Sequence, residues 1–399
     1  MSSRTAVWPA ILAATAGTFT VVTSEMLPIG LLTPLAADLD VSEGTAGLTM
    51  TVPGLVAAVA APIITRVIGR LDRRHVLMGL MVLLAAANFV SAAASNFPVL
   101  LASRVLIGVG IGGVWAISLT VAGRLATGKI AARANATVMS GIAIASVAGV
   151  PLGTWIGGLA GWRAAFAGGG ALALLVAAVM AAVLPSLPSE GRGGARVGSA
   201  TGLRVGLVVL AALVAGHFAA YTYVRPLLEQ VGGLTPGAIS ALLLVYGVAG
   251  VAGNFLVGIR APKAPAATLL AIAASLATVL AVVPLLVRGP AGATALLIAW
   301  GVAYGGVSVG TQVWLFSKAP DAREKVSAMV TSVFNLAIGG GALLGGLAAD
   351  ASGVRAAVWL GAGLVLISLV TAVRAETRRP SRAVGMPAAH RDEPDPALR

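Results

Sequence analysis

Three ionisable side chains lie well inside long apolar stretches of this sequence, where charge is rare: Glu25, Arg104 and His217. At 1.5 Å per residue, Glu25 lies roughly 13 Å and Arg104 roughly 9 Å inside their helices. A carboxyl group at this depth can take up and release a proton, or it can form a static ion pair with an arginine. The imidazole can titrate near neutral pH or stay neutral and hydrogen-bonded. We expect Glu25 and Arg104 to lie close together, and we assign proton coupling to these three residues.

A second group of polar and aromatic side chains is scattered through the same apolar stretches. Aromatic faces with a few amide groups suit planar, moderately polar solutes such as nucleosides. The same residue types also face lipid headgroups or pack in a core. A spacing of four residues places His217, Tyr221 and Arg225 on one face of a helix. The candidate substrate-binding residues are Asn88, Trp115, Tyr221, Tyr223, Arg225, Trp300, Tyr304, Gln312 and Asn335.

The elements that must position these residues follow from the composition. Of the 399 residues, 58% are hydrophobic and 10% are charged, and the mean hydropathy is +0.95. A soluble protein carries about 25% charged residues, and a disordered chain is polar and highly charged. The composition therefore excludes both classes. The chain has no cysteine, which excludes disulfides, thiolate metal sites and thiol nucleophiles.

The remaining function classes are limited by where the charges fall. The net charge of +13 does not form a basic patch, because basic residues alternate with apolar stretches, so no nucleic-acid partner is expected. An intramembrane enzyme or metal site needs clustered ionisable groups at membrane depth, and only one acid, Glu25, and one histidine, His217, lie well inside the apolar stretches. No Gly-Lys-Ser/Thr nucleotide-binding loop occurs. We expect an integral membrane protein in contact with the lipid bilayer, without catalytic activity, metal or cofactor.

The apolar stretches predict an all-α protein with twelve transmembrane helices, since roughly 20 apolar residues cross a bilayer. The runs are continuous, so an alternating β-barrel pattern is excluded. The expected spans are 7–33, 46–66, 75–95, 98–122, 134–160, 164–184, 204–230, 237–259, 265–287, 292–316, 326–349 and 355–374.

The distribution of basic residues predicts the orientation, because cytoplasmic loops carry an excess of Lys and Arg. With the N-terminus inside, only Arg163, Arg225, Arg288 and Arg355 fall on the outer side, and Arg104 lies within a span. The rest of the 27 basic residues fall on the inner side. Both termini are therefore expected to be cytoplasmic.

The two halves of the chain carry a repeat. The stretch GGLAGWRAAF at 157–166 returns as GGLAADASGVRAAVW at 345–359, between the fifth and sixth spans of each half. Repeats in the same orientation, six spans apart, indicate two parallel halves related by an axis along the membrane normal. The expected domains are an N-terminal six-helix bundle (1–184), a cytoplasmic linker (185–203), a C-terminal six-helix bundle (204–374) and a disordered cytoplasmic tail (375–399).

Six stretches of the sequence are distinctive. They are TSEMLPIGLLTPLAADLDVSEGTAGL (23–48), TRVIGRLDRRHVL (65–77), SRVLIGVGIGGVWAISL (103–119), GVPLGTWIGGLAGWRAAF (149–166), LPSLPSE (184–190) and GHFAAYTYVRPLLE (216–229). The sequence resembles the major facilitator superfamily, in particular the twelve-span drug:proton antiporter branch. The first half is similar to bacterial purine ribonucleoside efflux permeases, and the second half is more similar to sugar exporters. The resemblance implies two pseudo-symmetric six-helix bundles in a bacterial plasma membrane.

The family motif in the loop between the second and third spans is only partly matched. Arg73 and Arg74 fit its basic pair, which the resemblance associates with gating. Thr65 stands where the family has glycine, and Gly69 stands where it has aspartate, so the charge relay of that loop lacks its acid. Arg104 matches the family's arginine in the fourth span.

The antiporter signature of the fifth span is matched by Gly149, Pro151 and Gly153. Small residues recur there every four positions, which lets a neighbouring helix approach closely, and the proline adds a bend. The resemblance associates this bend with gating and export, while close packing alone also explains it.

Together, these features predict a proton-coupled secondary transporter that exports a small organic solute by alternating access. A nucleoside, a sugar and an antibiotic-like compound are all compatible, and the last would make the protein a drug-resistance factor. We expect a monomer. Proton-linked uptake, facilitated transport and a membrane sensor without transport stay open as alternatives.

Overall fold

The computed structural model describes residues 7–67, 71–125, 129–188, 201–318 and 323–377. Within these ranges every regular element is a helix, and twelve helical segments are long and apolar enough to cross a membrane. The predicted all-α fold with twelve spans is therefore confirmed. Most of the predicted linker and nearly all of the predicted tail lie outside the described residues.

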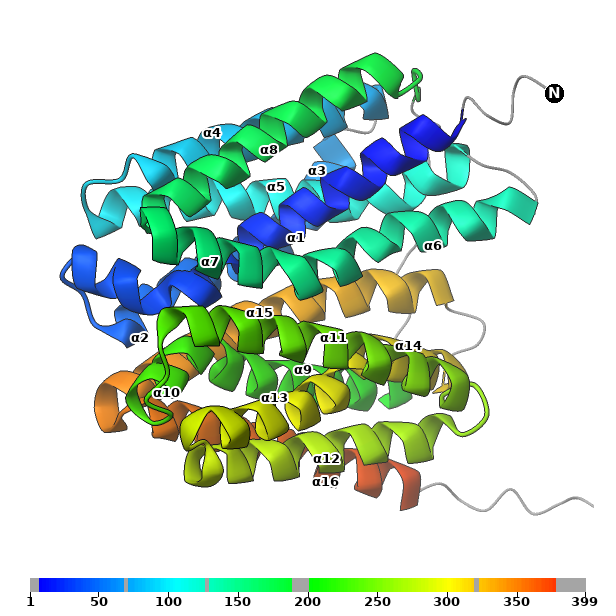
Figure 1. Cartoon of the computed structure of the whole chain (residues 1–399). Helices are drawn as coiled ribbons and strands as arrows, with labels where there is room; N and C mark the ends of the chain where they lie inside the picture. The colour runs from blue at the N-terminus through cyan, green and yellow to red at the C-terminus, as the bar shows by residue number, and fades with distance from the viewer. Residues whose placement is uncertain (1–6, 68–70, 126–128, 189–200, 319–322, 378–399) are drawn as a thin grey trace, which may run out of the picture.

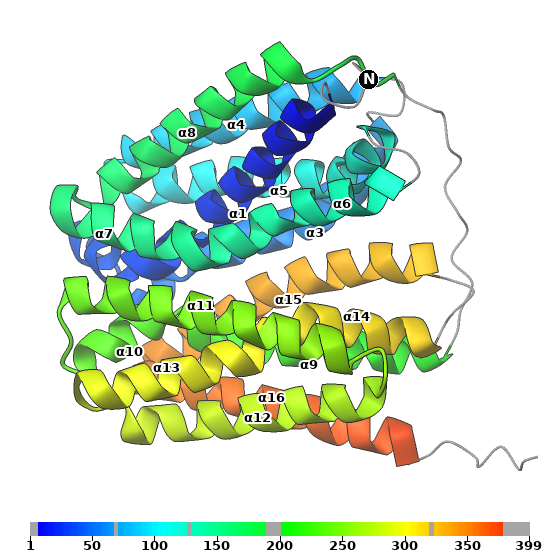
Figure 2. The same cartoon turned by 45° about the vertical axis from the view of Figure 1, so that its right-hand side comes forward.

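The first six spans form one bundle, drawn in blue to green in Figures 1 and 2. Its elements are α1 (Val7–Asp38), α2 (Glu43–Ala46), α3 (Leu48–Val67), α4 (Arg73–Ala92), α5 (Phe97–Leu125), α6 (Lys129–Ile144), the π-helical turn η2 (Ala145–Gly149), α7 (Val150–Ala160) and α8 (Trp162–Val183).

The last six spans form the second bundle, drawn in green to red. Its elements are α9 (Thr201–Tyr221), α10 (Val224–Gln230), α11 (Pro236–Arg260), α12 (Pro265–Leu286), α13 (Gly289–Gly305), α14 (Val307–Lys318), α15 (Arg323–Ser352) and α16 (Val354–Thr377).

The molecule has two distinct ends. We call the end at which α8 finishes and α9 begins the linker end, and the opposite end, with α2 and α10, the latched end. The bundles meet at the latched end and splay apart toward the linker end (Figure 2). Helices α3 and α15 pack together across the interface, and α11 packs against η2 and α7.

The hydrophobic core follows the same division. One cluster of buried side chains joins the latched half of the N-terminal bundle, including Ile29, Met50 and Val150, to the C-terminal bundle. A second cluster, with Ile11, Leu84 and others, fills the linker half of the N-terminal bundle alone. The apolar contact between the bundles is therefore concentrated at the latched end.

The sequence repeat has a direct counterpart in the backbone. Gly161 separates α7 from α8 with φ 82°, and Gly353 separates α15 from α16 with φ 83°. Both positions use a left-handed conformation that glycine adopts without steric cost. The two six-span halves thus make the same turn at the same place.

Two spans differ from the expected continuous helices. The seventh breaks between Tyr221 and Val224, because Pro226 has no N–H to bond the carbonyl of Thr222 and its ring crowds that carbonyl. The expectation that His217, Tyr221 and Arg225 share one helix face is wrong for Arg225, which belongs to the separate helix α10.

The first span is longer than expected. Pro34 was expected to end it, but α1 continues to Asp38. Prolines are tolerated inside membrane helices when another donor satisfies the carbonyl that they free. Here Pro34 frees the Gly30 carbonyl, and the Arg225 side chain supplies the donor.

Candidate functional site

Arg104 is completely buried, and its guanidinium group bonds to main-chain carbonyls from two other helices. Its Nε donates to the Thr49 carbonyl of α3 at 2.9 Å. Its Nη1 and Nη2 donate to the carbonyls of Ser24 and Glu25 of α1 at 3.2 and 3.1 Å. The arginine therefore joins α1, α3 and α5 at one point.

Two of these carbonyls lack a helical partner because of prolines. In an α-helix the carbonyl of a residue accepts from the N–H four positions later. For Ser24 that position is Pro28, and for Thr49 it is Pro53; neither proline has an N–H. Arg104 supplies both missing donors, which explains how a guanidinium group is satisfied in an apolar bundle.

The Glu25 carboxylate has a different environment. The side chain is only 3% exposed, and its Oε1 atom is buried with no hydrogen-bond partner. The ion pairs in the described part of the chain do not include one between this carboxylate and Arg104, which bonds the main chain of Glu25 instead. The carboxylate lies within electrostatic range of Arg104 and of the Tyr304 hydroxyl in the other bundle.

Facing this acid, the C-terminal bundle contains a stack of aromatic rings. His217 stacks on Tyr304 with ring centroids 3.3 Å apart and on Tyr221 at 5.0 Å. Tyr221 in turn stacks on Tyr246 at 4.7 Å. Trp300 meets this stack edge-on, and its Nε1 donates to Nδ1 of His217 at 3.2 Å. The Nε2 atom of His217 is buried without a partner.

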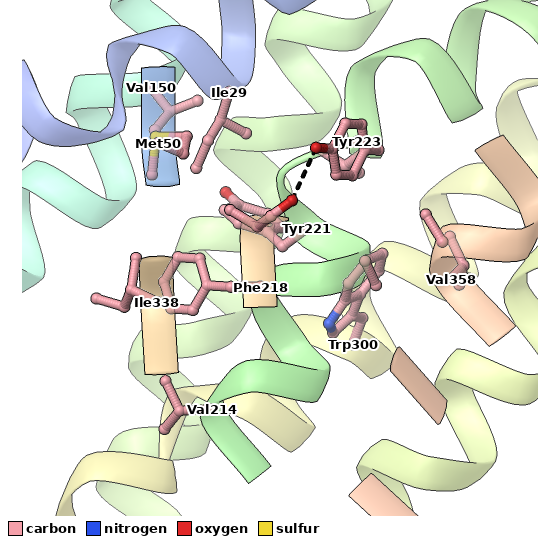
Figure 3. Close-up of a cluster of buried hydrophobic side chains, with 14 of the residues drawn as sticks. Ile29, Met50, Val150, Val214, Phe218, Tyr221, Tyr223, Trp300, Ile338 and Val358 are labelled. Carbon is pink, nitrogen blue, oxygen red and sulfur yellow. Dashed lines mark hydrogen bonds between the residues drawn. The ribbon is translucent and has the colours of Figure 1, made fainter. Parts of the chain in front are cut away.

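Figure 3 shows how this cluster reaches the bundle interface. Phe218 and Tyr221 project from α9 and Trp300 from α13, while Ile29 and Met50 of the N-terminal bundle lie nearby. The structure brings four predicted residues together, His217, Tyr221, Trp300 and Tyr304. It adds Tyr246 of α11, which sequence reasoning missed because a single tyrosine among apolar residues gave no signal.

Asn88 lies inside the N-terminal bundle rather than in this aromatic cluster. Its Nδ2 donates to the Ser24 hydroxyl at 3.0 Å and to the Leu84 carbonyl at 2.9 Å, and its Oδ1 is buried without a partner. Its contact with Ser24 places it one residue from Glu25. It therefore supports α1 beside the acid.

Three further predicted residues lie elsewhere along the bundles. Trp115 packs against the core of the linker half of the N-terminal bundle. Gln312 is partly buried on α14. Asn335 is buried on α15, where its Nδ2 donates to the Thr331 carbonyl at 2.9 Å.

Tyr223 and Arg225 lie at the latched end. The Tyr223 hydroxyl donates to the Ala342 carbonyl at 2.8 Å, and a Cβ added at Gly47 of the other bundle would lie 1.9 Å from it. Arg225 donates to the Gly30 carbonyl, also in the other bundle. Both residues therefore contact the N-terminal bundle.

The signature glycines of the fifth span pack along α1. A Cβ added at Gly149 would lie 2.7 Å from the Thr23 hydroxyl, and one added at Gly153 would lie 2.3 Å from Leu27. The π-helical turn ends at Gly149, just before Pro151. The Pro151 carbonyl accepts a hydrogen bond from the Ser240 hydroxyl of the other bundle at 2.8 Å. This segment therefore touches both α1 and the second bundle.

At the linker end, Arg73 and Arg74 fasten the start of α4 to the end of the bundle. The Arg73 N–H donates to the Leu187 carbonyl at 3.0 Å, and Nη2 of Arg74 donates to the Ala181 carbonyl at 2.6 Å. Both bonds lie within the N-terminal half of the chain.

Asp72, which precedes this basic pair, was not singled out from the sequence. It caps α4 by accepting from the Arg74 N–H, and it also accepts from the Ser186 hydroxyl at 2.6 Å and the Leu187 N–H at 2.8 Å. Burial alone raises the pKa of Asp72, but these hydrogen bonds and the nearby His75 lower that pKa to about 2. An aspartate directly before a helix is a capping signal that could have identified it.

Twelve spans in two similar bundles, with a buried acid and an aromatic cluster at their interface, define a membrane transporter that works between two half-molecules. Residues 14–341 match the family model of the Major Facilitator Superfamily, and the chain belongs to that family. It is a multi-pass membrane transporter and not an enzyme.

Curated relatives align over nearly the whole chain. The chain is 34% identical over 387 residues to the "Transcription regulatory protein OpdE" of Pseudomonas aeruginosa, covering 94% of this chain and 95% of that protein. It is 32% identical over 375 residues to the "Purine ribonucleoside efflux pump NepI" of Salmonella paratyphi A, covering 92% and 94%.

Solved structures show the same fold. A bacterial homologue of the human lysosomal transporter Spinster, in an inward-facing and unoccupied conformation, matches with a TM-score of 0.73 at 17% identity. The match covers 93% of this chain and 97% of that chain. The occupied inward-facing form matches with a TM-score of 0.74 at 16% identity.

Proposed function

We propose that this transporter exports a small organic solute from the bacterial cytoplasm in exchange for protons. In this proposal the linker end faces the cytoplasm, because the basic loops lie there. The latched end then faces outward. The structure with its bundles joined at the latched end is the inward-facing arrangement of the cycle.

The observation that carries this proposal is the unpartnered carboxylate oxygen of Glu25 at the interface between the bundles. Arg104 uses its donors on main-chain carbonyls, so it holds α1 in place without occupying that oxygen. An acid that is buried, unpaired and within range of Tyr304 in the other bundle can change its protonation as the bundles move. Glu25 is therefore the proposed proton carrier.

The aromatic cluster supports a planar ring as part of the substrate. Tyr304, His217 and Tyr221 form a largely buried stack of flat rings, and Nε2 of His217 has no hydrogen-bond partner that would compete with a polar edge of a substrate. Purine nucleosides are the first candidates, because relatives at 32% identity are named as purine ribonucleoside efflux pumps. Sugars and antibiotic-like compounds complete the panel to be tested.

The test is transport by purified protein in proteoliposomes that contain a pH-sensitive dye. We expect an imposed pH gradient to drive accumulation of one substrate class, with stoichiometric proton movement. Glu25→Gln should lose the pH-driven accumulation but keep substrate exchange at equal pH. Asp40→Asn is the matched control, because Asp40 is an exposed acid with φ 52°, a backbone conformation that asparagine also adopts. Full pH-driven accumulation by Glu25→Gln would refute the proposal.

The name of one relative favours a second candidate. That protein, 34% identical to this chain, is called a transcription regulatory protein, so a sensor that binds a solute without moving it is the alternative. Substrate-dependent stabilisation without transport in proteoliposomes would support the sensor. Transport that ignores pH would instead support facilitated movement, and accumulation in the reverse direction would support proton-linked uptake.

A further inference from the structure

A buried arginine donates a hydrogen bond from one bundle to the other at the latched end. Nη1 of Arg225, on α10, donates to the Gly30 carbonyl of α1. That carbonyl lacks its helical partner because the residue four positions later is Pro34, which has no N–H. The arginine therefore satisfies an acceptor that α1 leaves open on the face toward the second bundle.

The other side of this arginine is held by an acid of its own bundle. Its Nε donates to Oε1 of Glu229 at 2.8 Å, one helical turn further along α10. The Oε2 atom of Glu229 is buried and has no partner. A carboxylate can accept two parallel bonds from one guanidinium group. The Oε2 atom of Glu229 can therefore accept a second hydrogen bond from Arg225.

A neutral hydroxyl makes the other buried hydrogen bond between the bundles, from Ser240 to the Pro151 carbonyl. The remaining hydrogen bonds between the bundles at this end are more exposed. Asp350 accepts from the Ser42 hydroxyl at 2.8 Å and from the Gly44 N–H at 2.9 Å, and Gln230 donates to Glu43 at 2.9 Å. Water can replace such bonds at little cost, whereas a buried acceptor without a donor is costly. Arg225 is only 4% exposed.

We propose that Arg225 is the latch that keeps the outward side closed, and that it changes partner during the cycle. In the closed state it divides its donors between Gly30 and Glu229. When the bundles separate at this end, Arg225 leaves Gly30, whose carbonyl then meets water, and bonds both oxygens of Glu229. The acid keeps the freed arginine satisfied, which lowers the cost of opening. This role rests on the proposed alternating-access function.

The proposal predicts a shift in the balance of the two conformations. Spin labels at Ser95→Cys and Ala291→Cys report on the latched end, and labels at His75→Cys and Lys263→Cys report on the linker end. All four positions are exposed, and the chain has no native cysteine to interfere. Distances are measured by double electron–electron resonance on the full-length protein in lipid nanodiscs.

Three variants separate the latch from a general loss of structure. Arg225→Met should increase the population open at the latched end by about tenfold, the effect of one lost charge-assisted bond, and should close the linker end in parallel. Pro34→Ala restores a helical N–H for Gly30, so it should shift the balance in the same direction without removing a charge. Arg163→Met is the matched control, because Arg163 pairs with Asp38 at the same end but within one bundle.

The outcomes distinguish the latch from the proposed transport. Reciprocal distance changes in the Arg225 and Pro34 variants, with none in the Arg163 variant, would support the latch even if no substrate were found. Unchanged distances in both latch variants would overturn it while leaving pH-driven transport by the wild-type protein intact. If Arg225→Met broadens the distance distributions at both ends, instead of lengthening one distance and shortening the other, the variant has unfolded. The Pro34→Ala result then decides between the latch and its absence.

Discussion

Replacing Arg104 with methionine should destabilise the N-terminal bundle by a predictable amount. The substitution keeps most of the apolar stem but leaves the carbonyls of Ser24 and Thr49 without donors, because Pro28 and Pro53 cannot supply them. Each buried acceptor left unsatisfied costs about 1–3 kcal/mol. Removing a buried charge offsets part of this cost, so we expect a net loss of about 2–3 kcal/mol in the free energy of unfolding.

The same reasoning predicts that the loss depends on the prolines. In a chain that carries Pro28→Ala and Pro53→Ala, both carbonyls have helical N–H partners, so Arg104→Met should cost much less there. The double-mutant cycle should give a coupling energy of about 1–2 kcal/mol, in the range for residues that share a hydrogen-bond network. Arg104→Lys should lie between the wild type and methionine, since one ammonium cannot reach both helices as a planar guanidinium group does.

The assay is reversible unfolding in mixed detergent micelles, followed by circular dichroism at rising dodecyl sulfate concentration. Each variant is compared with wild type in the same micelles. An equal loss for Arg104→Met with and without the prolines would refute the carbonyl argument. It would show that the arginine stabilises the bundle through its charge or its packing alone.

Three further outcomes are expected. Trp300→Phe removes the buried donor to Nδ1 of His217 while keeping a ring, so the apparent substrate affinity measured by counterflow should fall several-fold and the melting temperature should also fall. A Cβ added at Gly247 would lie only 2.6 Å from the Val147 Cα of the other bundle. Gly247→Leu should therefore push the bundles apart, and spin-label distances should show the latched end opening. Asp72→Asn should lower the melting temperature at pH 7. Because the folded pKa of Asp72 is about 2 and its ordinary value is 3.8, the difference from wild type should shrink as the pH falls from about 4 to about 2. A difference that is as large at pH 2 as at pH 7 would contradict this.

The architecture could be predicted from the sequence because its physical basis is local. Each span is a continuous apolar run, so the twelve spans follow from hydropathy. The repeat at Gly161 and Gly353 shows in the letters themselves and marks the same left-handed turn in both halves. Buried charge is costly, which singles out Glu25 and Arg104 against an apolar background.

The hydrogen-bond partners of those charged side chains could not be predicted from the sequence. We expected Glu25 and Arg104 to lie close together, and Arg104 does contact the main chain of Glu25. The sequence did not show that its donors go to backbone carbonyls on α1 and α3. A carbonyl freed by a proline can be located from the sequence, since it lies four residues earlier. Which arginine reaches it depends on how the helices cross.

The sequence alone determined the number of spans, the duplication and the few positions where charge enters the apolar part of the protein. The tertiary structure decided that Tyr246 joins the aromatic cluster, that Asn88 points into its own bundle, and that Arg225 crosses to Gly30. The physical reason is that lipid is as apolar as the protein core. A membrane helix is therefore apolar on all sides, and its sequence does not show which face meets a neighbour until the helices pack.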